Sequence, residues 1–329
     1  MKTATMKNFK NILYVNESSV DQEPAIARAV SLAENNQADL TVVDVIPTQV
    51  ITAGIGLPPG GPISIGLQEA IVANHRSDLE YVLQPFADRL SIRMDVFVGK
   101  PFLEVIRTVL KNEYDLVIKP AENPNWAKRL FGSDDMHLLR KCPCPLWLMK
   151  PNEKSNYTNI VAAIDCDQVY PAPSGRDLNR AILELAASLA LSDFASLHIV
   201  HAWEALSEVI KLSGKVASLE CADKFIEKMN EYHRNEMTKH AEKLRGWIGN
   251  DTYNYLSPSL YLPKGPAEKM IPQMAVELDA DLVVMGTVAR AGISGVIIGN
   301  TAEAILEQFV CSVLALKPPG FKTPVKVEP

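Results

Sequence analysis

Short apolar runs alternate along the chain with longer segments in which apolar residues recur every three or four positions. The first five runs lie at 11–15, 40–46, 92–98, 115–119 and 145–149. Between them come segments such as 23–36, where Ala25, Ala29 and Ala33 fall on one helical face. Runs rich in β-branched residues predict buried strands, and the periodic segments predict amphipathic helices. The alternation therefore predicts βα units on a parallel sheet.

The same order of elements occurs a second time. Five further runs predict strands at 159–164, 196–203, 259–262, 281–285 and 312–316. The Asp-Leu-Val of 115–117 returns at 281–283, and the Lys-Pro of 150–151 returns at 317–318. Such a repeat predicts two tandem domains, at 1–151 and 152–329, joined by a polar stretch. Each is expected to be an α/β, doubly wound, Rossmann-like domain with a five-stranded parallel sheet.

Each copy carries an insertion after its second strand. In the first copy the insertion is the Pro/Gly-rich segment 48–66, and in the second it is the irregular stretch 204–222. A long charged helix is predicted after the second insertion, ending near residue 247. The first insertion fits a mobile flap over a cleft and a plain surface insertion equally well.

Composition and charge narrow the classes of function. Of the 329 residues, 47% are hydrophobic and 22% charged, which is typical of a globular protein and excludes a disordered one. The net charge of −6 gives no general attraction to nucleic acid. An odd cysteine count of five, a polar start and the lack of a long apolar run predict a cytoplasmic protein with reduced thiols and no membrane partner.

Candidate chemistry gathers where the first and fourth strands of the second copy end. In an open α/β sheet, ligands bind beyond the carboxyl ends of the strands, where the strand order reverses. Asp165 follows the first strand of this copy, and a glycine-containing segment, 286–301, follows the fourth. Backbone N–H groups of such a loop can approach phosphate oxygens, while a carboxylate can accept hydrogen bonds from a base or a sugar hydroxyl.

This segment resembles that of the universal stress protein family, whose ATP-binding members carry G-x2-G-x9-G-[ST] after the fourth strand. Gly286 and Gly299 have the required spacing, but Ala289 replaces the second glycine and Asn300 the final Ser/Thr, with Thr301 one position later. The resemblance covers nearly the whole chain. Its tandem form is supported by HLLRKCP at 137–143 and GNTAE at 299–303.

The resemblance implies a cytoplasmic regulator or sensor of the stress response that binds ATP, ADP or AMP, with or without Mg²⁺, in its second domain. It implies that Asp165 contacts the adenine or the ribose. Arg290 could contact phosphate and so compensate in part for the lost second glycine. The remaining phosphate-side positions are Met285, Gly286, Ala289, Gly299, Asn300 and Thr301. An alanine methyl at 289 would cost roughly 1 kcal/mol if that position needs a positive φ. No catalytic residue is predicted, and turnover is limited to slow hydrolysis or autophosphorylation of Ser294 or Thr301.

Three alternatives remain open. Asn300 and Glu303 fit a capping box, which would make the glycines a structural turn, and the Glu303 carboxylate would oppose a triphosphate at this helix end. The lost glycine and the insertions would also suit a bulkier ligand, lipid-bearing or a nucleotide sugar. Finally, the chain could be an interaction module without an active site.

The first copy departs further from the family pattern. Its fourth strand ends in Lys119-Pro120, and proline offers no N–H. Asp134 and Asp135 start the following helix, where they would repel phosphate, and Glu17 is the expected match to Asp165. The first copy is therefore predicted not to bind ATP. Lys128 and Arg129 suit a solvated loop better than an anion site.

No metal site is predicted from the histidines. His198 and His201 are three apart on a strand and should face opposite sides, while His233 and His240 are about 10 Å apart along a helix. The family resemblance also implies that the two copies pair through their fifth strands as an internal pseudo-dimer, which would cover both apolar edges, and a homodimer of the whole chain is left open.

Overall fold

The computed structural model describes residues 9–48, 62–122, 133–150, 153–166, 173–204, 219–287 and 299–327; side chains at 62–64, 173–177 and 219–223 are left aside. The chain divides into two compact units. The N-terminal unit holds the described residues up to Ser155 together with 321–327. The C-terminal unit holds those from Asn156 to Gly320.

The N-terminal unit is built on parallel strands in the order β3-β2-β1-β4-β5. Its strands are β1 (Asn11–Val15), β2 (Asp39–Pro47), β3 (Ile92–Gly99), β4 (Leu116–Pro120) and β5 (Leu146–Met149). Its helices are α1 (Glu23–Asn36), α3 (Pro62–Leu83), the 3-10 turn η1 (Gln84–Phe86), α4 (Pro101–Asn112) and α6 (Asp134–Lys141). The side chains of β1, β4 and β5 are almost entirely buried, as strands covered on both faces require.

The C-terminal unit repeats this topology in the order β10-β9-β6-β7-β8, again with parallel pairing. Its strands are β6 (Asn159–Ala163), β7 (Ser196–Val200), β8 (Ser259–Tyr261), β9 (Leu282–Gly286) and β10 (Ser312–Leu316). Its helices are α7 (Pro173–Asp193), α9 (Leu219–Ile248), α10 (Asn250–Leu256), α11 (Ala267–Glu277) and α12 (Asn300–Leu306). The predicted α/β architecture with two five-stranded, doubly wound sheets is confirmed. The predicted strand at 196–203 ends earlier, at Val200, and Trp203 makes an isolated bridge to Lys264.

A repeated aspartate anchors the start of the first strand in each unit. The carboxylate of Asp115 accepts from the backbone N–H groups of Lys10 (2.7 Å) and Asn11 (3.2 Å). That of Asp281 accepts from those of Thr158 (2.6 Å) and Asn159 (3.1 Å). The repeated Asp-Leu-Val motif is thus explained by strand pairing at the amino edge of each sheet.

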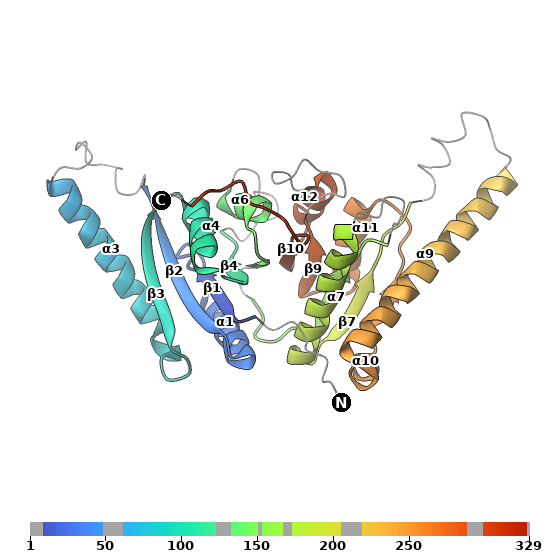
Figure 1. The fold of residues 1–329 in the computed structure, drawn as a ribbon, viewed down its shortest axis with the longest axis horizontal. Helices are drawn as coiled ribbons and strands as arrows, with labels where there is room; N and C mark the ends of the chain where they lie inside the picture. Colours follow the sequence, from blue (N-terminus) through green and yellow to red (C-terminus); the bar gives the residue numbers. More distant parts are fainter. Residues whose placement is uncertain are drawn as a thin grey trace. The chain divides into compact units, whose positions relative to one another are not determined.

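Long helices follow both insertions. Figure 1 shows α3 beside β3 in the N-terminal unit and α9 beside α7 and β7 in the C-terminal unit. On α9 the buried apolar residues Met237, Ala241, Leu244 and Ile248 recur at helical spacing and face the core. The predicted helix ending near 247 is confirmed at Ile248. Of the predicted insertions, residues 49–61 and 205–218 lie outside the described part of the chain, whereas 62–66 and 219–222 are the first residues of α3 and α9.

Within the described residues, no helix combines the length and the apolar character that crossing a bilayer requires.

Candidate functional site

The first and fourth strands of the C-terminal unit end side by side. β6 pairs with β9 so that Ala163 lies opposite Met285, and β6 pairs on its other side with β7. The chain therefore leaves β6 toward Asp165 next to the point where it leaves β9 at Gly286. This is the carboxyl edge of the sheet at the reversal of strand order, where α/β proteins bind ligands.

The backbone around Asp165 is fixed by two side chains from other elements. Asn179 of α7, which is 5% exposed, accepts from the Asp165 N–H (3.2 Å) and donates to its C=O (2.6 Å). The Nδ1 atom of His201 lies 3.3 Å from the N–H of Cys166 and 3.3 Å from the C=O of Ile164. The Asp165 side chain itself is exposed at the edge of the sheet. These hydrogen bonds fix the backbone on both sides of the exposed Asp165 residue.

The loop after β9 is closed at its base by a hydrogen bond. The Gly299 N–H donates to the Thr287 C=O (3.0 Å), and the Thr287 N–H donates to the Leu316 C=O at the end of β10 (3.1 Å). The Lys317 ammonium donates to the Thr287 hydroxyl (2.5 Å). The two predicted glycine positions, 286 and 299, therefore meet at one place, with a half-buried lysine beside them.

Met285 and Gly286 are held by packing. Met285 is 4% exposed and lies in the sheet, opposite Ala163 and Ala315. A Cβ atom at Gly286 would lie 2.6 Å from Cδ2 of Leu178 on α7. A side chain at position 286 would therefore require the Leu178 side chain to move.

The helix after the loop begins one residue earlier than the capping-box hypothesis requires. Gly299 is the N-cap of α12, its C=O accepts from the Glu303 N–H (2.9 Å), and no side chain caps the helix. Asn300 is instead the first helical residue, so the predicted Asn300–Glu303 capping box is wrong. Asn300 and Thr301 are both exposed.

The predicted contacts Ala289 and Arg290 and the candidate phosphorylation site Ser294 lie outside the described residues, as do Lys128 and Arg129 in the first copy.

At the equivalent edge of the N-terminal unit, a buried lysine binds three carboxylates. Strand register places Lys119 where the other unit has Met285, and Pro120 where it has Gly286. The Lys119 Nζ atom lies 2.8 Å from Asp135 Oδ1, 3.0 Å from Glu17 Oε2 and 3.6 Å from Glu122 Oε1. It also donates to the Pro120 C=O (3.2 Å). The edge is filled by its own ion cluster.

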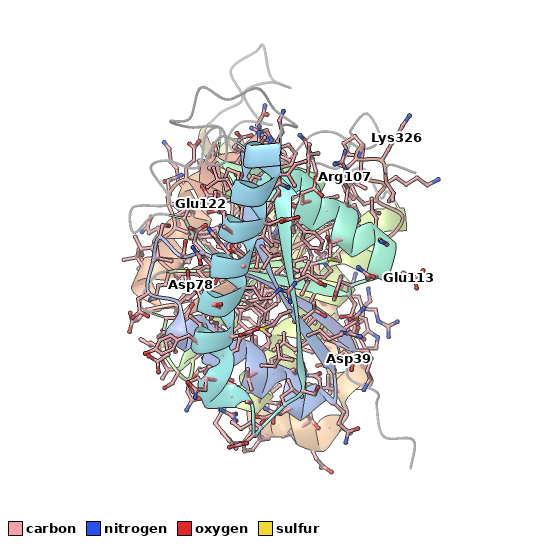
Figure 2. All side chains as sticks on the ribbon, turned by 90° about the vertical axis from the view of Figure 1, so that its left-hand side faces the viewer. Asp39, Asp78, Arg107, Glu113, Glu122 and Lys326 are labelled. Carbon is pink, nitrogen blue, oxygen red and sulfur yellow. The ribbon has the colours of Figure 1, made fainter. Side chains whose placement is uncertain are left out.

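The cluster shifts the protonation of its members. Burial by itself lowers the pKa of Lys119, but the charges of Asp135, Glu17 and Glu122 outweigh it and raise that pKa above its usual value. Burial and the charge of Asp135 raise the pKa of Glu122 to about 7, against the attraction of Lys119. For Glu17, burial is outweighed by Lys119 and by Ser19, and its pKa is lowered. Figure 2 shows Glu122 in the upper half of the view and Asp39, at the start of β2, in the lower half.

The helix that follows this edge also supplies its own capping groups. Ser133 is the N-cap of α6, and its hydroxyl accepts from the Met136 N–H (3.2 Å). Asp135 is 3% exposed, and its carboxylate accepts from the Glu122 N–H (3.0 Å) as well as binding Lys119. Serine at this position serves the helix rather than a phosphate.

Two of the histidines form a buried pair. His201 follows β7 and His233 lies on α9, each is 2% exposed, and His201 Nε2 lies 3.0 Å from His233 Nδ1. Burial, His233 and His240 lower the pKa of His201 to about 4. His198 faces elsewhere, toward Asn159 Oδ1 (3.2 Å), as predicted from its spacing. Among the described residues, no group of three or more His, Cys, Asp or Glu side chains is arranged to hold a metal ion.

Sequence reasoning missed Asn179, His201 and Lys317 as parts of this edge. Asn179 is a polar residue on an otherwise apolar helix face, and that mismatch was a usable signal. Lys317 belongs to a Lys-Pro repeat whose position directly after a fifth strand also pointed to the carboxyl edge. The His201–His233 contact joins residues 32 apart in the sequence and had no such signal.

Comparison with known proteins gives a consistent family. The universal stress protein family profile matches residues 8–150 and 258–317. "Universal stress protein E" of Photorhabdus laumondii is 26% identical over 98% of this chain and 99% of its own length. The protein of the same name from Escherichia coli K12 is 27% identical over 98% of each chain.

Solved structures show the same fold. A protein of unknown function from Pseudomonas aeruginosa PAO1 is similar with a TM-score of 0.66 at 25% identity, over 95% of this chain and 94% of its own. A universal stress protein from Archaeoglobus fulgidus is similar with a TM-score of 0.60 over 94% of this chain and 98% of its own, and at 15% identity this likeness concerns the fold alone.

Proposed function

The chain belongs to the universal stress protein family, and from this premise we propose that its C-terminal unit binds ATP or a related nucleotide, ADP or AMP. The ligand site is the carboxyl edge formed by Asp165, Gly286 and Gly299. The protein acts as a cytoplasmic regulator or sensor through binding, with slow ATP hydrolysis at most.

One observation carries the proposal. The Gly299–Thr287 hydrogen bond (3.0 Å) brings both ends of the loop to the exit of β9, beside the exit of β6 that bears the exposed Asp165 carboxylate. A carboxylate and a glycine-bounded loop at one strand crossover supply both kinds of contact that a nucleotide needs. Asp165 would accept from a ribose hydroxyl or the adenine amine, and the loop backbone would face the phosphates.

The groups present fit a polyphosphate ligand. Lys317 places an ammonium beside the loop base, where it can balance phosphate charge. Because the described residues hold no preformed cluster of metal ligands, Mg²⁺ would enter with the phosphates, as it does in many nucleotide sites. When bound, Mg²⁺ would neutralise part of the phosphate charge.

The N-terminal unit is proposed to take no nucleotide. Its Lys119 ammonium is already bound by Asp135 and Glu17 within 3.0 Å. A phosphate at that edge would meet three carboxyl groups around an ammonium whose charge they already neutralise. One nucleotide per chain is therefore the expected stoichiometry.

Native mass spectrometry of the full chain, purified without added nucleotide, tests this proposal, with any released ligand identified after denaturation. ATP, ADP or AMP at one per chain is the expected result. For protein that is purified empty, added MgATP at about 100 times Kd should stabilise the chain by about 2.7 kcal/mol in thermal unfolding. Asp165→Ala should weaken this effect, and Asp251→Ala, which removes an exposed carboxylate on α10, should leave it unchanged.

Two results would contradict the proposal. A heavier, lipid-bearing or nucleotide-sugar mass would show that the loop serves another ligand. If the protein is purified empty, and added MgATP stabilises neither the wild type nor Asp165→Ala, the result would favour an interaction module.

A further inference from the structure

The buried pair His201–His233 joins the long helix α9 to the candidate ligand edge. We propose that His201 is a positioning residue for the Asp165 turn and that His233 selects which hydrogen bond His201 makes to that turn. The ligand part of this inference rests on the proposed nucleotide site, whereas the link between α9 and the turn does not.

The His201 ring is anchored from the sheet side. Its backbone N–H donates to the Tyr261 C=O of β8 (3.0 Å), and the residue is 2% exposed. Its Nδ1 atom lies 3.3 Å from both the Cys166 N–H and the Ile164 C=O, the two peptide groups that flank Asp165. One ring nitrogen therefore faces a donor and an acceptor, and it can satisfy only one of them at a time.

The other ring nitrogen is engaged by α9. His201 Nε2 and His233 Nδ1 are 3.0 Å apart, which is hydrogen-bond distance, and one proton must lie between them. The His233 ring is held by neighbouring aromatic rings, with Trp203 at 5.4 Å and Tyr232 at 5.2 Å between ring centroids. Its orientation is therefore set by packing as well as by the hydrogen bond.

The position of that proton decides the state of the turn. When His201 Nε2 carries it and donates to His233 Nδ1, His201 Nδ1 is an acceptor and holds the Cys166 N–H. When His233 Nδ1 carries it, His201 Nε2 accepts, so His201 Nδ1 must carry its own proton and donates to the Ile164 C=O. The two histidines thus always have the same tautomer, both protonated at Nε2 or both at Nδ1.

The surroundings keep His201 neutral, which this choice requires. From α9, His240 acts on His201, and His240 itself lies near Lys243 and near Glu236, which is bound to Lys239 (2.6 Å). Burial, His233 and His240 lower the pKa of His201 to about 4, so the ring carries one proton at neutral pH.

The N-terminal unit contains a matching strand-to-helix pair. Asn11 lies opposite Asp39 and Asn159 lies opposite Ser196, so Asp44 corresponds in register to His201. Asp44 Oδ2 lies 2.5 Å from Nδ1 of His75 on α3, the helix that follows the first insertion. A carboxylate only accepts, so this pair has a single arrangement, whereas the two imidazoles of the C-terminal unit have two.

Two measurements that need no ligand test the link in the full chain. In ¹⁵N spectra at pH 7, His201 and His233 should be neutral and show the same tautomer; opposite tautomers or a charged ring would overturn the proposal. In His233→Phe, the His201 Nδ1–H form should predominate, because a buried lone pair is tolerated better than a buried N–H without an acceptor. Hydrogen exchange of the Cys166 amide should then accelerate by about tenfold.

Matched variants separate this link from general loosening. His198→Phe makes the same substitution at a histidine of β7 that faces Asn159 and not the His201–His233 pair. It should change the rate of Cys166 amide exchange less than twofold. His233→Asn restores a hydrogen-bonding group near the position of Nδ1 and should return Cys166 exchange toward that of the wild type. Unchanged Cys166 exchange in folded His233→Phe, or equal acceleration in His198→Phe, would overturn the proposal. If His233→Phe does not fold, the tautomers of His201 and His233 in the wild type and Cys166 exchange in His233→Asn decide the question.

MgATP titrations then test the consequence for the ligand. His233→Phe should raise Kd roughly fivefold, the usual effect of one hydrogen bond, and His233→Asn should recover most of the loss. If the wild type binds no MgATP, the proposed function fails while the tautomer and exchange results still decide the link. If the wild type binds and Kd is the same in His233→Phe, the positioning role fails and the nucleotide site stands.

Discussion

Lys119 Nζ and Asp135 Oδ1 lie 2.8 Å apart, and each of these two side chains is only 4% exposed. Lys119 comes from the end of β4 and Asp135 from the first turn of α6, so the ion pair closes the carboxyl edge of the N-terminal unit from within. The stability of that unit should depend on it.

Replacing Lys119 with methionine, the residue at the same register in the other unit, should lower the stability of the N-terminal unit by about 3–5 kcal/mol, since it leaves buried carboxylates without their cation. Urea unfolding at pH 7 measures the loss. Lys111→Met, on an exposed position of α4, is the matched control and should cost under about 1 kcal/mol. The deficit of Lys119→Met should shrink at pH 5 as the carboxylates take up protons; equal deficits at both pH values would contradict this account.

Glu122 makes the N-terminal unit more stable toward acid pH. Its folded pKa of about 7, raised by burial and by Asp135, lies above that of an unfolded glutamate, 4.5. The folded state therefore binds more protons between these values, and this contribution to stability is full below about pH 4.5 and is lost as the pH rises through 7. Glu122→Gln should flatten the slope, as measured by hydrogen exchange within β1 and β4 and corrected for its intrinsic pH dependence.

His201 has the opposite effect in the C-terminal unit. Burial and the neighbouring histidines lower its folded pKa to about 4, below the ordinary value of 6.5. The unfolded state then binds more protons, so this stability is present above about pH 6.5 and about 3 kcal/mol is lost as the pH falls through 4. Hydrogen exchange within β7 and α9 should accelerate over this range, after the same correction. His201→Asn should remove the trend, and a trend that persists in this variant would assign it to another group.

Gly286→Ala should destabilise the C-terminal unit by at most about 1 kcal/mol, because the new methyl group would lie 2.6 Å from Leu178 Cδ2 and this half-buried side chain would have to shift. The loss of stability caused by Leu178→Ala should then be smaller in the Gly286→Ala variant than in the wild type. Gly246→Ala on α9, where a Cβ meets nothing within 4 Å, should instead stabilise the helix by up to about 1 kcal/mol. Thermal unfolding of the four variants decides, and additive effects at 286 and 178 would contradict the packing explanation.

The sequence predicted the sheets well because β-branched runs such as 11–15 and 312–316 are buried on both faces and flanked by polar segments. It also placed Asp165 and Gly286 at strand ends, since a strand that stops defines an edge. The first residue of a helix is less sharply defined by the sequence. Asn300 is a good capping residue, yet the first hydrogen bond of α12 runs from the Glu303 N–H to the Gly299 C=O, so Gly299 is the N-cap.

Contacts across the fold were beyond the sequence pattern. Spacing rules for His198 and His201, or for His233 and His240, compare residues on one predicted element, whereas the bond that forms joins the residue after β7 to α9. Asn179 likewise reaches Asp165 from a different element. The pairing of the two repeats through their fifth strands, and the state of assembly of the chain, stay predictions.

The lysine at the end of β4 gives the N-terminal unit a counter-ion that is covalently part of the chain. Such a partner has a fixed effective concentration that neither dilution nor the supply of metabolites in the cell changes. A site that depends on a diffusible ligand varies with that supply through mass action. In a protein whose C-terminal unit responds in this way, the Lys119–Asp135 ion pair of the N-terminal unit would not follow the supply of that ligand.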